Sequence, residues 1–177
     1  TLGTASVVAA GEGVVRTSVT LEMIAGLVRV ERSSLAPSNA RESTWTLQTA
    51  KKPTTRPVDA SRDELAAMLG LPTGAVSDEP LWVNTGVEQL VIPLASAELV
   101  RATKPVMSLI EKFGFSESRD EAMAYVWARD TSTAPNGDPS TMTVRFFFTS
   151  NCELLEDPAT GSACANLGGW LIARRAP

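Results

Sequence analysis

The chain has 177 residues, a formal net charge of −4 and 44% hydrophobic residues, enough for the buried core of one domain or two small ones. Its 16 lysines and arginines are scattered along the sequence and its aromatic content is only 6%, which argues against a surface for nucleic acid. No apolar run reaches the ~18 residues that a membrane-spanning helix needs. We therefore expect neither nucleic acid nor a membrane as a partner.

Metal sites and disulfide frameworks are also disfavoured. The chain contains only two cysteines, Cys152 and Cys164, without Cys-x-x-Cys spacing, and it contains no histidine. Zinc sites and small secreted scaffolds need more of these residues at closer spacing. With so few cysteines, we expect a reducing, cytoplasmic location.

The first part of the chain alternates between helix and strand patterns. Small residues over 1–11 predict a buried helix, and Ser61 with Glu64 forms a capping-box pattern for a helix that ends at Leu69. Alternating apolar and polar residues predict half-buried strands at 17–23, 27–32 and 44–48. A polar loop is expected at 33–43 and a connector at 51–57.

The second part continues this alternation and ends in a helix of unusual composition. Strands are predicted at 81–84, 89–94, 122–129 and 141–149, and short helices at 97–102 and 106–113. The last helix, 163–173, consists almost entirely of small residues in its first two turns, which suits a helix surrounded on every side by other backbone. Four aromatic residues at strand spacing are interpreted as core and not as a stacking platform: Trp82, Trp127, Phe146 and Phe148.

The most informative motif is Glu-Asp-Pro-Ala-Thr-Gly-Ser-Ala at 156–163, directly before the last helix. Gly161 would let a ligand approach the backbone, Ser162 offers a hydroxyl, and the free N–H groups of the first turn carry the positive end of the helix dipole. Asp157 would be stabilised there as the anion and could hydrogen-bond to a polar substrate. The alternative, that Asp157 and Thr160 only cap the helix, stays open.

A similar pattern stands at the start of the chain. Gly3-Thr4-Ala5-Ser6 aligns with Gly161-Ser162-Ala163-Cys164, and this alignment also brings Ala10-Gly11 opposite Gly168-Gly169. Self-similarity separated by most of the chain predicts two related halves, each with a central helix, and not a repeat protein of short period.

These residues resemble the PhzF-like isomerases of phenazine biosynthesis, a family related to diaminopimelate epimerase. The motif at 156–163 is the most specific part of the resemblance, and Thr1-Leu2-Gly3-Thr4-Ala5 is similar to the segment that follows a Gly-His pair in that family. Between them, Asn84-Thr85-Gly86-Val87 and the apolar run 90–94 are similar to the strand that opens the family's second domain.

The resemblance implies an α+β fold of two similar halves, each a curved, mostly antiparallel sheet wrapped around a central helix. Residues 1–78 would be the remainder of the first epimerase-like domain and residues 79–177 the second, with the boundary near Asp78. Members act without a metal or organic cofactor, by moving a proton on a small substrate in the cleft between the halves. The family's acid/base glutamate and its Gly-His pair lie before Thr1, so we expect this chain to be part of a longer protein, incomplete at both ends.

The motif and the resemblance together assign site residues. Asp157 is the expected catalytic residue of this chain, orienting a substrate amine or hydroxyl, and the N–H groups of Gly161 and Ser162 would bind the substrate carboxylate or its developing charge. The other expected substrate-binding residues are Thr160, Ala163, Thr1, Thr85 and Gly86. The proton carrier would be the upstream glutamate.

Cys164 and Glu156 lie near these residues but are not assigned to the catalytic machinery. Relatives in the epimerase branch use a cysteine at a comparable helix start, but the small apolar neighbours of Cys164 favour a packed core thiol over a base. Glu156 and Asp157 are adjacent at an irregular turn, so we expect their side chains to point apart and not to form a catalytic pair.

The expected function is that of a cofactor-independent isomerase or epimerase, a homodimer that moves a proton on a small carboxylate-bearing metabolite. Two alternatives stay open. A fold can outlive its chemistry, so a non-catalytic protein that binds a small anion or metabolite would keep the same helix start. The motif would otherwise be purely structural, in an interaction module.

Overall fold

The computed structural model of the protein describes residues 8, 17–23, 26–32, 45–49, 51–130 and 141–175. They belong to two compact units, Thr1–Lys52 and Pro53–Pro177, which are described separately. The helix expected at 1–11, apart from residue 8, and the loop expected at 33–43 fall outside the described residues. No helix within the described part is long and apolar enough to cross a membrane.

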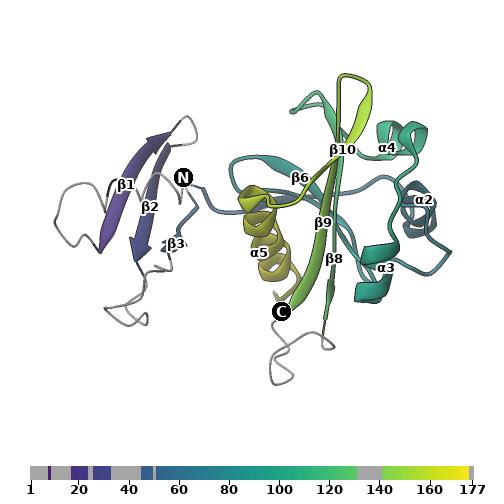
Figure 1. Ribbon diagram of the computed structural model, residues 1–177, viewed down its shortest axis with the longest axis horizontal. Helices are drawn as coiled ribbons and strands as arrows, with labels where there is room; N and C mark the ends of the chain where they lie inside the picture. Colours follow the sequence, from purple (N-terminus) through teal and green to yellow (C-terminus); the bar gives the residue numbers. More distant parts are fainter. Residues whose placement is uncertain are drawn as a thin grey trace. The chain divides into compact units, whose positions relative to one another are not determined.

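In the first unit, the described residues form an antiparallel sheet of three strands in the order β1-β2-β3 (Figure 1). The strands are β1 (Ser18–Met23), β2 (Gly26–Arg32) and β3 (Trp45–Leu47). Their alternating pattern buries Val28 and Val30, which pack against Val19, Leu21, Trp45 and Leu47. The three strands expected from the sequence are confirmed.

The second unit is built on a sheet that has seven strands within the described residues, in the order β10-β9-β8-β6-β5-β4, with β7 paired to β8. The strands are β4 (Thr54–Pro57), β5 (Leu81–Asn84), β6 (Glu88–Pro93), β7 (Phe115–Ser116), β8 (Glu121–Arg129), β9 (Met142–Ser150) and β10 (Glu153–Asp157). Strands β6 and β8 are parallel and the other pairs are antiparallel. The helical crossover between β6 and β8 makes their parallel pairing possible.

Helices cover both faces of this sheet (Figure 1). One face carries α2 (Arg62–Met68), α3 (Ala97–Ala102) and α4 (Met107–Phe113), and the opposite face carries α5 (Gly161–Arg175). The capping box predicted for α2 is confirmed, because Ser61 and Glu64 each accept the backbone N–H of the other. Helix α5 lies against β4, β5 and β6 and buries one side of its surface: Ala163, Asn166, Leu167, Gly169 and Trp170.

The core of the second unit lies between the sheet and its helices. Trp82, Trp127 and Phe146 are only 3%, 6% and 8% exposed, and Phe148 packs against the same cluster. Trp127 meets Trp170 of α5 edge to face, with ring centroids 5.0 Å apart. The interpretation of the four strand aromatics as core is therefore confirmed.

Part of the expected connector is a strand. Residues 54–57 form β4, the edge strand of the sheet, and pair with β5. Proline is tolerated in an edge strand because the N–H that it lacks would have no sheet partner on the open side. Arg56 fastens this edge: its guanidinium lies 4.4 Å from the ring centroid of Trp82 and donates to both oxygens of Glu88, at 2.9 and 3.0 Å. A polar, proline-flanked sequence thus pairs as a strand with β5, and Arg56 adds side-chain contacts to this backbone pairing.

Strand β10 is also missing from the sequence prediction. It forms a hairpin with β9 through the two-residue turn Asn151-Cys152, whose φ angles of 50° and 61° lie in the left-handed region. Such turns usually contain glycine, and this one does not. The domain boundary expected near Asp78 lies inside the second unit, and the division into epimerase-like halves at 1–78 and 79–177 stays a prediction.

The expectation that the last helix is surrounded on every side is wrong. Cys164 is exposed in its first turn, and Ile172 is 66% exposed near its end. Gly169, on the buried side, does need its small size, because a Cβ there would lie 2.8 Å from Val83 Cγ1 and 2.9 Å from Pro53 Cβ. Small residues in α5 therefore serve close packing on one side of the helix only.

Candidate functional site

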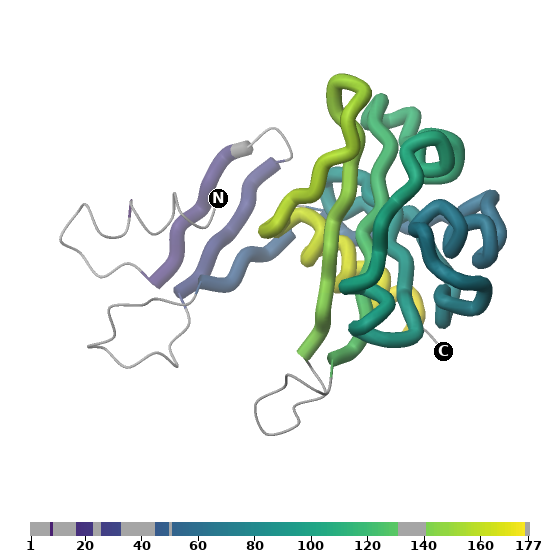
Figure 2. Tube along the Cα trace, turned by 45° about the vertical axis from the view of Figure 1, so that its right-hand side comes forward, coloured from purple at the N-terminus to yellow at the C-terminus, as the bar shows by residue number. Residues whose placement is uncertain are grey.

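The motif at 156–163 forms the turn that leads from β10 into α5 (Figure 2). Asp157 ends the strand opposite Phe146, and its Oδ1 accepts a hydrogen bond of 3.0 Å from the N–H of Ala159. This bond closes a local Asx turn. The side chain is half-buried, and its Oδ2 has no partner among the described residues, so it is available to accept from a bound molecule.

The first turn of α5 has backbone N–H groups without a partner in the part of the chain that the structure describes. Gly161 and Ser162 are exposed, and no described atom accepts a hydrogen bond from either N–H. The first backbone bond at this end is the one from Cys164 N–H to Thr160 O, at 3.3 Å. Unpaired N–H groups at a helix start, together with the helix dipole, favour a bound anion.

Side-chain capping, the alternative interpretation of the motif, is not observed. Asp157 bonds within its own turn, and Thr160 Oγ1 bonds to Ser162 Oγ at 3.2 Å and not to an amide. By contrast, Ser96 caps α3 by accepting from the N–H of Leu99. Helix α4 also starts without a side-chain cap, so the missing cap of α5 is informative only together with its exposed amides.

Gly161 has open space around the position that a Cβ would take. Its φ lies outside the left-handed region, so the backbone conformation does not demand glycine. A Cβ added to Gly161 would meet nothing within 4 Å. Neither backbone strain nor packing against the described residues therefore requires a glycine at this position.

Behind the turn, a buried hydrogen-bond network joins α5 to the β5–β6 hairpin. Asn166, fully buried on α5, accepts at Oδ1 from the N–H and the hydroxyl of Thr85, at 2.9 and 2.8 Å. Its Nδ2 donates to Val87 O and to Gln89 Oε1, both at 2.8 Å. Gln89 Nε2 in turn donates to Ser162 Oγ at 3.2 Å. The network therefore ends on a hydroxyl of the candidate site.

Gln89 and Asn166 are not among the residues predicted from the sequence. The available signals are an asparagine inside a helix of small apolar residues and a glutamine inside an apolar strand, since buried amides require hydrogen-bond partners. Their partners, however, are separated from them by 73 to 81 positions in the sequence. Only the tertiary structure brings these partners together.

The remaining predicted binding residues have different environments. Thr85 is 8% exposed and donates both its N–H and its hydroxyl to Asn166, so it lies behind the turn without a spare donor. Gly86 is exposed in the hairpin turn, Ala163 is fully buried, and Thr1 lies outside the described residues. Direct contact of these residues with a ligand stays a prediction. The candidate site itself consists of the accessible residues of the turn: Asp157, Thr160, Gly161 and Ser162.

Glu156 has a different partner from Asp157. Arg145 of β9 donates to both carboxylate oxygens of Glu156 at 2.7 Å and to backbone carbonyls at the end of α3, including Thr103 O at 2.8 Å. The hydrogen bonds from Arg145 hold the pKa of the Glu156 carboxyl below its ordinary value. This arrangement agrees with the expectation that Glu156 and Asp157 do not act as a catalytic pair.

Cys164 is exposed, so its interpretation as a packed core thiol is wrong. The buried side of α5 is centred on Ala163 and Asn166, and position 164 lies at its margin. There its Sγ lies 3.6 Å from Tyr125 Oη. Burial, and after it the hydrogen bond to Cys164, raises the pKa of the Tyr125 hydroxyl, which therefore stays protonated beside the thiol.

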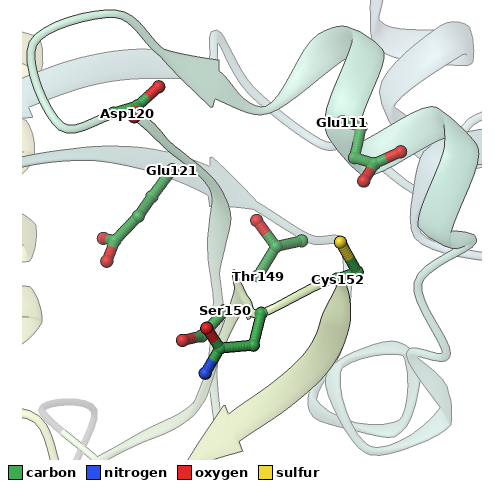
Figure 3. A pocket seen from close by; sticks show the side chains of 7 residues that line it. Glu111, Asp120, Glu121, Thr149, Ser150 and Cys152 are labelled. Carbon is green, nitrogen blue, oxygen red and sulfur yellow. The ribbon is translucent and has the colours of Figure 1, made fainter.

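A separate pocket of about 290 Å³ lies at the opposite end of β10, beside the tip of the β9–β10 hairpin (Figure 3). Glu111, Asp120 and Glu121 give it an acidic lining, and Asn151 and Cys152 contribute the hairpin tip. No cluster of histidine, cysteine, aspartate and glutamate that could hold a metal ion is present in the described part of the chain. Residues of the motif do not line this pocket, so it is not part of the candidate site.

Comparison with known proteins assigns the chain to a family. The model of the family described as phenazine biosynthesis-like protein (PhzC-PhzF) matches residues 1–176. This chain belongs to that family. It is 32% identical over 115 residues to a protein named as an uncharacterized isomerase of Pasteurella multocida (strain Pm70), an alignment that covers 65% of this chain and 35% of the relative.

Solved structures of PhzF-like proteins share the fold. The PhzF-family phenazine biosynthesis protein of Bacillus anthracis aligns with a TM-score of 0.71 and 20% identity, over 93% of this chain and 52% of its own. A PhzF-family protein of Enterococcus faecalis gives a TM-score of 0.60 and 19% identity, over 98% and 55% of the two chains. A predicted epimerase of Pseudomonas aeruginosa gives a TM-score of 0.64 and 17% identity, over 96% of this chain and 54% of its own. The expected α+β, epimerase-like fold is confirmed, and the chain spans about half the length of these three structures.

Proposed function

We propose that the turn at 157–162 binds the negatively charged group of a small carboxylate-bearing molecule, in an isomerase that moves a proton on that molecule. The PhzF-like family and the relative named as an isomerase support an isomerase role in general. The observation that carries the more specific proposal is the pair of N–H groups of two exposed residues, Gly161 and Ser162, which have no acceptor among the described residues, with open space around an added Gly161 Cβ.

The donors and acceptors of the turn suggest the chemistry of the ligand. The two amides and a hydroxyl of the Thr160–Ser162 pair suit a carboxylate, whereas the free Oδ2 of Asp157 suits an N–H or O–H donor on the same molecule. A hydroxy acid or an amino acid carries both groups on neighbouring carbons. We therefore propose a substrate of this class, bound by its carboxylate and oriented through its hydroxyl or amine by Asp157.

The same amides also suit the reaction. When a proton leaves a carbon next to a carboxylate, negative charge develops on the carboxylate oxygens, and fixed backbone N–H groups stabilise such charge without rearranging. Asp157, already accepting from Ala159, would orient the substrate, and a separate carboxyl group, a glutamate in the resembling family, would carry the proton. We also propose that the protein works without a cofactor, forms a homodimer and is located in the cytoplasm.

Binding is tested by titrating the ¹⁵N-labelled chain with sodium acetate, sodium glycolate and sodium sulfate and following its amide resonances by NMR. The Gly161 and Ser162 amides are expected to move with each anion, and glycolate to bind more tightly than acetate because its hydroxyl can donate to Asp157. If these two amides remain unmoved by all three anions, the proposed site is excluded. Reaction is tested with the full-length protein in D₂O, by the exchange of the Cα hydrogen of hydroxy and amino acids.

A non-catalytic binding protein is the second candidate. Asp157 is the one titratable side chain among the four residues of the candidate site, so the turn by itself supplies binding groups and a single carboxylate. Anion binding at Gly161 and Ser162 together with no exchange of any Cα hydrogen would favour this candidate over the isomerase.

A further inference from the structure

The direction of the buried network behind the turn is set by backbone atoms. The N–H of Thr85 can only donate, so the atom of Asn166 that meets it is the oxygen Oδ1. The carbonyl of Val87 can only accept, so the atom that meets it is the nitrogen Nδ2. Two backbone groups of the β5–β6 hairpin therefore fix which way the Asn166 amide faces.

This direction is passed on to Ser162. The second N–H of Asn166 Nδ2 donates to Gln89 Oε1, which leaves Gln89 Nε2 to donate to Ser162 Oγ. Asn166 and Gln89 are 0% and 3% exposed, so turning either amide over would leave buried polar groups unpaired. Gln89 is thereby held as a donor, and Ser162 Oγ receives this bond as an acceptor.

Counting the hydroxyl hydrogens of the turn shows whether one of them is free to donate to a ligand. Ser162 and Thr160 have one O–H each, and the bond between their oxygens at 3.2 Å uses one of the two hydrogens. Gln89 already fills an acceptor position on Ser162 with its own N–H. One hydroxyl hydrogen of the pair is therefore left without an acceptor among the described residues, beside the exposed amides of the same turn.

We infer that Gln89 and Asn166 are positioning residues, which keep the Thr160–Ser162 pair oriented as a hydroxyl donor toward an anion at the start of α5. The inference rests on the proposed function, because it adds a third donor to the same anion site. Gln89 acts only through Ser162 and touches no ligand itself. If the network only stabilised the fold, a change at Gln89 would weaken anion binding equally with and without the Ser162 hydroxyl. If the network positions that hydroxyl, a change at Gln89 weakens binding only when the hydroxyl is present.

The test is a double-mutant cycle on sulfate binding, measured by amide chemical shifts together with thermal unfolding of each variant. Ser162→Ala removes the oriented hydroxyl and is expected to raise the Kd for sulfate about tenfold, as for a lost hydrogen bond to a charged group. Gln89→Met keeps the length of the side chain but cannot donate, and is expected to raise the Kd about threefold to tenfold. The double variant should bind no more weakly than Ser162→Ala alone.

Ser116→Ala is the matched control. Its hydroxyl is also fully buried and donates to Glu88 at 2.6 Å, next to Gln89 in the chain, but it is not part of the network that ends at Ser162. This variant should lower the midpoint of thermal unfolding and leave the Kd for sulfate unchanged. If it weakens binding as much as Gln89→Met does, a general loss of stability explains both effects and the inference is overturned.

The outcomes separate this inference from the proposed function. If Ser162→Ala weakens sulfate binding and Gln89→Met does not, or if their effects multiply in the double variant, the positioning role is overturned while the anion site stands. If the unaltered protein does not bind sulfate at Gly161, the proposed function fails first. Should Gln89→Met not fold, the side-chain NH₂ resonances of Gln89 in the unaltered protein decide: they should move with sulfate, and must not move in Ser162→Ala.

Discussion

Replacing Gly161 by alanine is expected to make the protein more stable and its anion binding weaker. The φ of Gly161 lies outside the left-handed region and an added Cβ meets nothing within 4 Å, so the folded chain accepts alanine without strain. Alanine also restricts the unfolded chain, a gain of about 0.4–1 kcal/mol at a compatible site. In a protein of this size, a gain of 1 kcal/mol raises the Tm by about 2–4 °C.

The same methyl group would stand in the space through which a ligand reaches the amides. Loss of one hydrogen bond to a charged group costs about 1.5–3 kcal/mol, so we expect the Kd for sulfate to rise at least about tenfold. Thermal unfolding and sulfate titration of the same sample measure both effects. Opposite signs of the two effects would distinguish Gly161 from a glycine needed for the fold.

Two neighbouring glycines of α5 provide matched controls. A Cβ at Gly168 also meets nothing within 4 Å, so Gly168→Ala should add about 1 kcal/mol of helix stability and leave sulfate binding unchanged. A Cβ at Gly169 would come within 2.8 Å of Val83 Cγ1, so Gly169→Ala should destabilise the protein by about 1–3 kcal/mol. A Gly161→Ala variant that becomes more stable but binds sulfate unchanged would refute the access role of this glycine.

Three further outcomes are expected. Asp157→Asn keeps an oxygen for the N–H of Ala159, so stability should stay within about 0.5 kcal/mol while glycolate binding falls toward that of acetate; equal loss of both anions would contradict this. The hydrogen bond from Arg56 lowers the pKa of the Glu88 carboxyl, so its stabilising effect is present above the ordinary value of about 4.3 and is lost as the pH falls through the lower folded value. Glu88→Gln should therefore flatten the dependence of Tm on pH below about 4, and an unchanged slope would refute this. Cys152→Gly should raise the free energy of unfolding in urea by about 0.5–1 kcal/mol, because glycine adopts the left-handed conformation without strain; a decrease would count against strain at this turn.

The candidate turn could be predicted from sequence because its signals are local. Asp157, Gly161 and Ser162 lie within six positions of one another, between a strand-like run and a helix without proline. The order of these elements fixes the exposed amides at the helix start. Gln89 and Asn166 could not be predicted in the same way, because their contact depends on how β6 and α5 pack, and the two residues lie 77 positions apart in the sequence.

The sequence predictions that were wrong or incomplete, for Cys164, β10 and β4, also have local causes. The first turns of α5 contain almost no large apolar side chain, so the sequence does not show which side faces the sheet, and it predicts a buried Cys164 where the structure has an exposed one. The hairpin before the motif turns at Asn151-Cys152 without glycine, so β10 lacks its usual sequence marker. At β4 the polar sequence is typical of a connector, and its pairing with β5 and the contacts of Arg56 with Trp82 and Glu88 appear only in the tertiary structure.

The origin of the network in the N–H of Thr85 and the carbonyl of Val87 has an evolutionary consequence. Main-chain atoms persist through almost every substitution, and only proline at position 85 would delete the N–H. Lineages can therefore exchange the side chains at 85 and 87 without reversing the order of donors and acceptors. Positions 89 and 166 have no such freedom, since each amide is complementary to the other. Change at these two sites is expected to be coordinated, and relatives that replace one member alone should show a compensating residue at the other or at position 162.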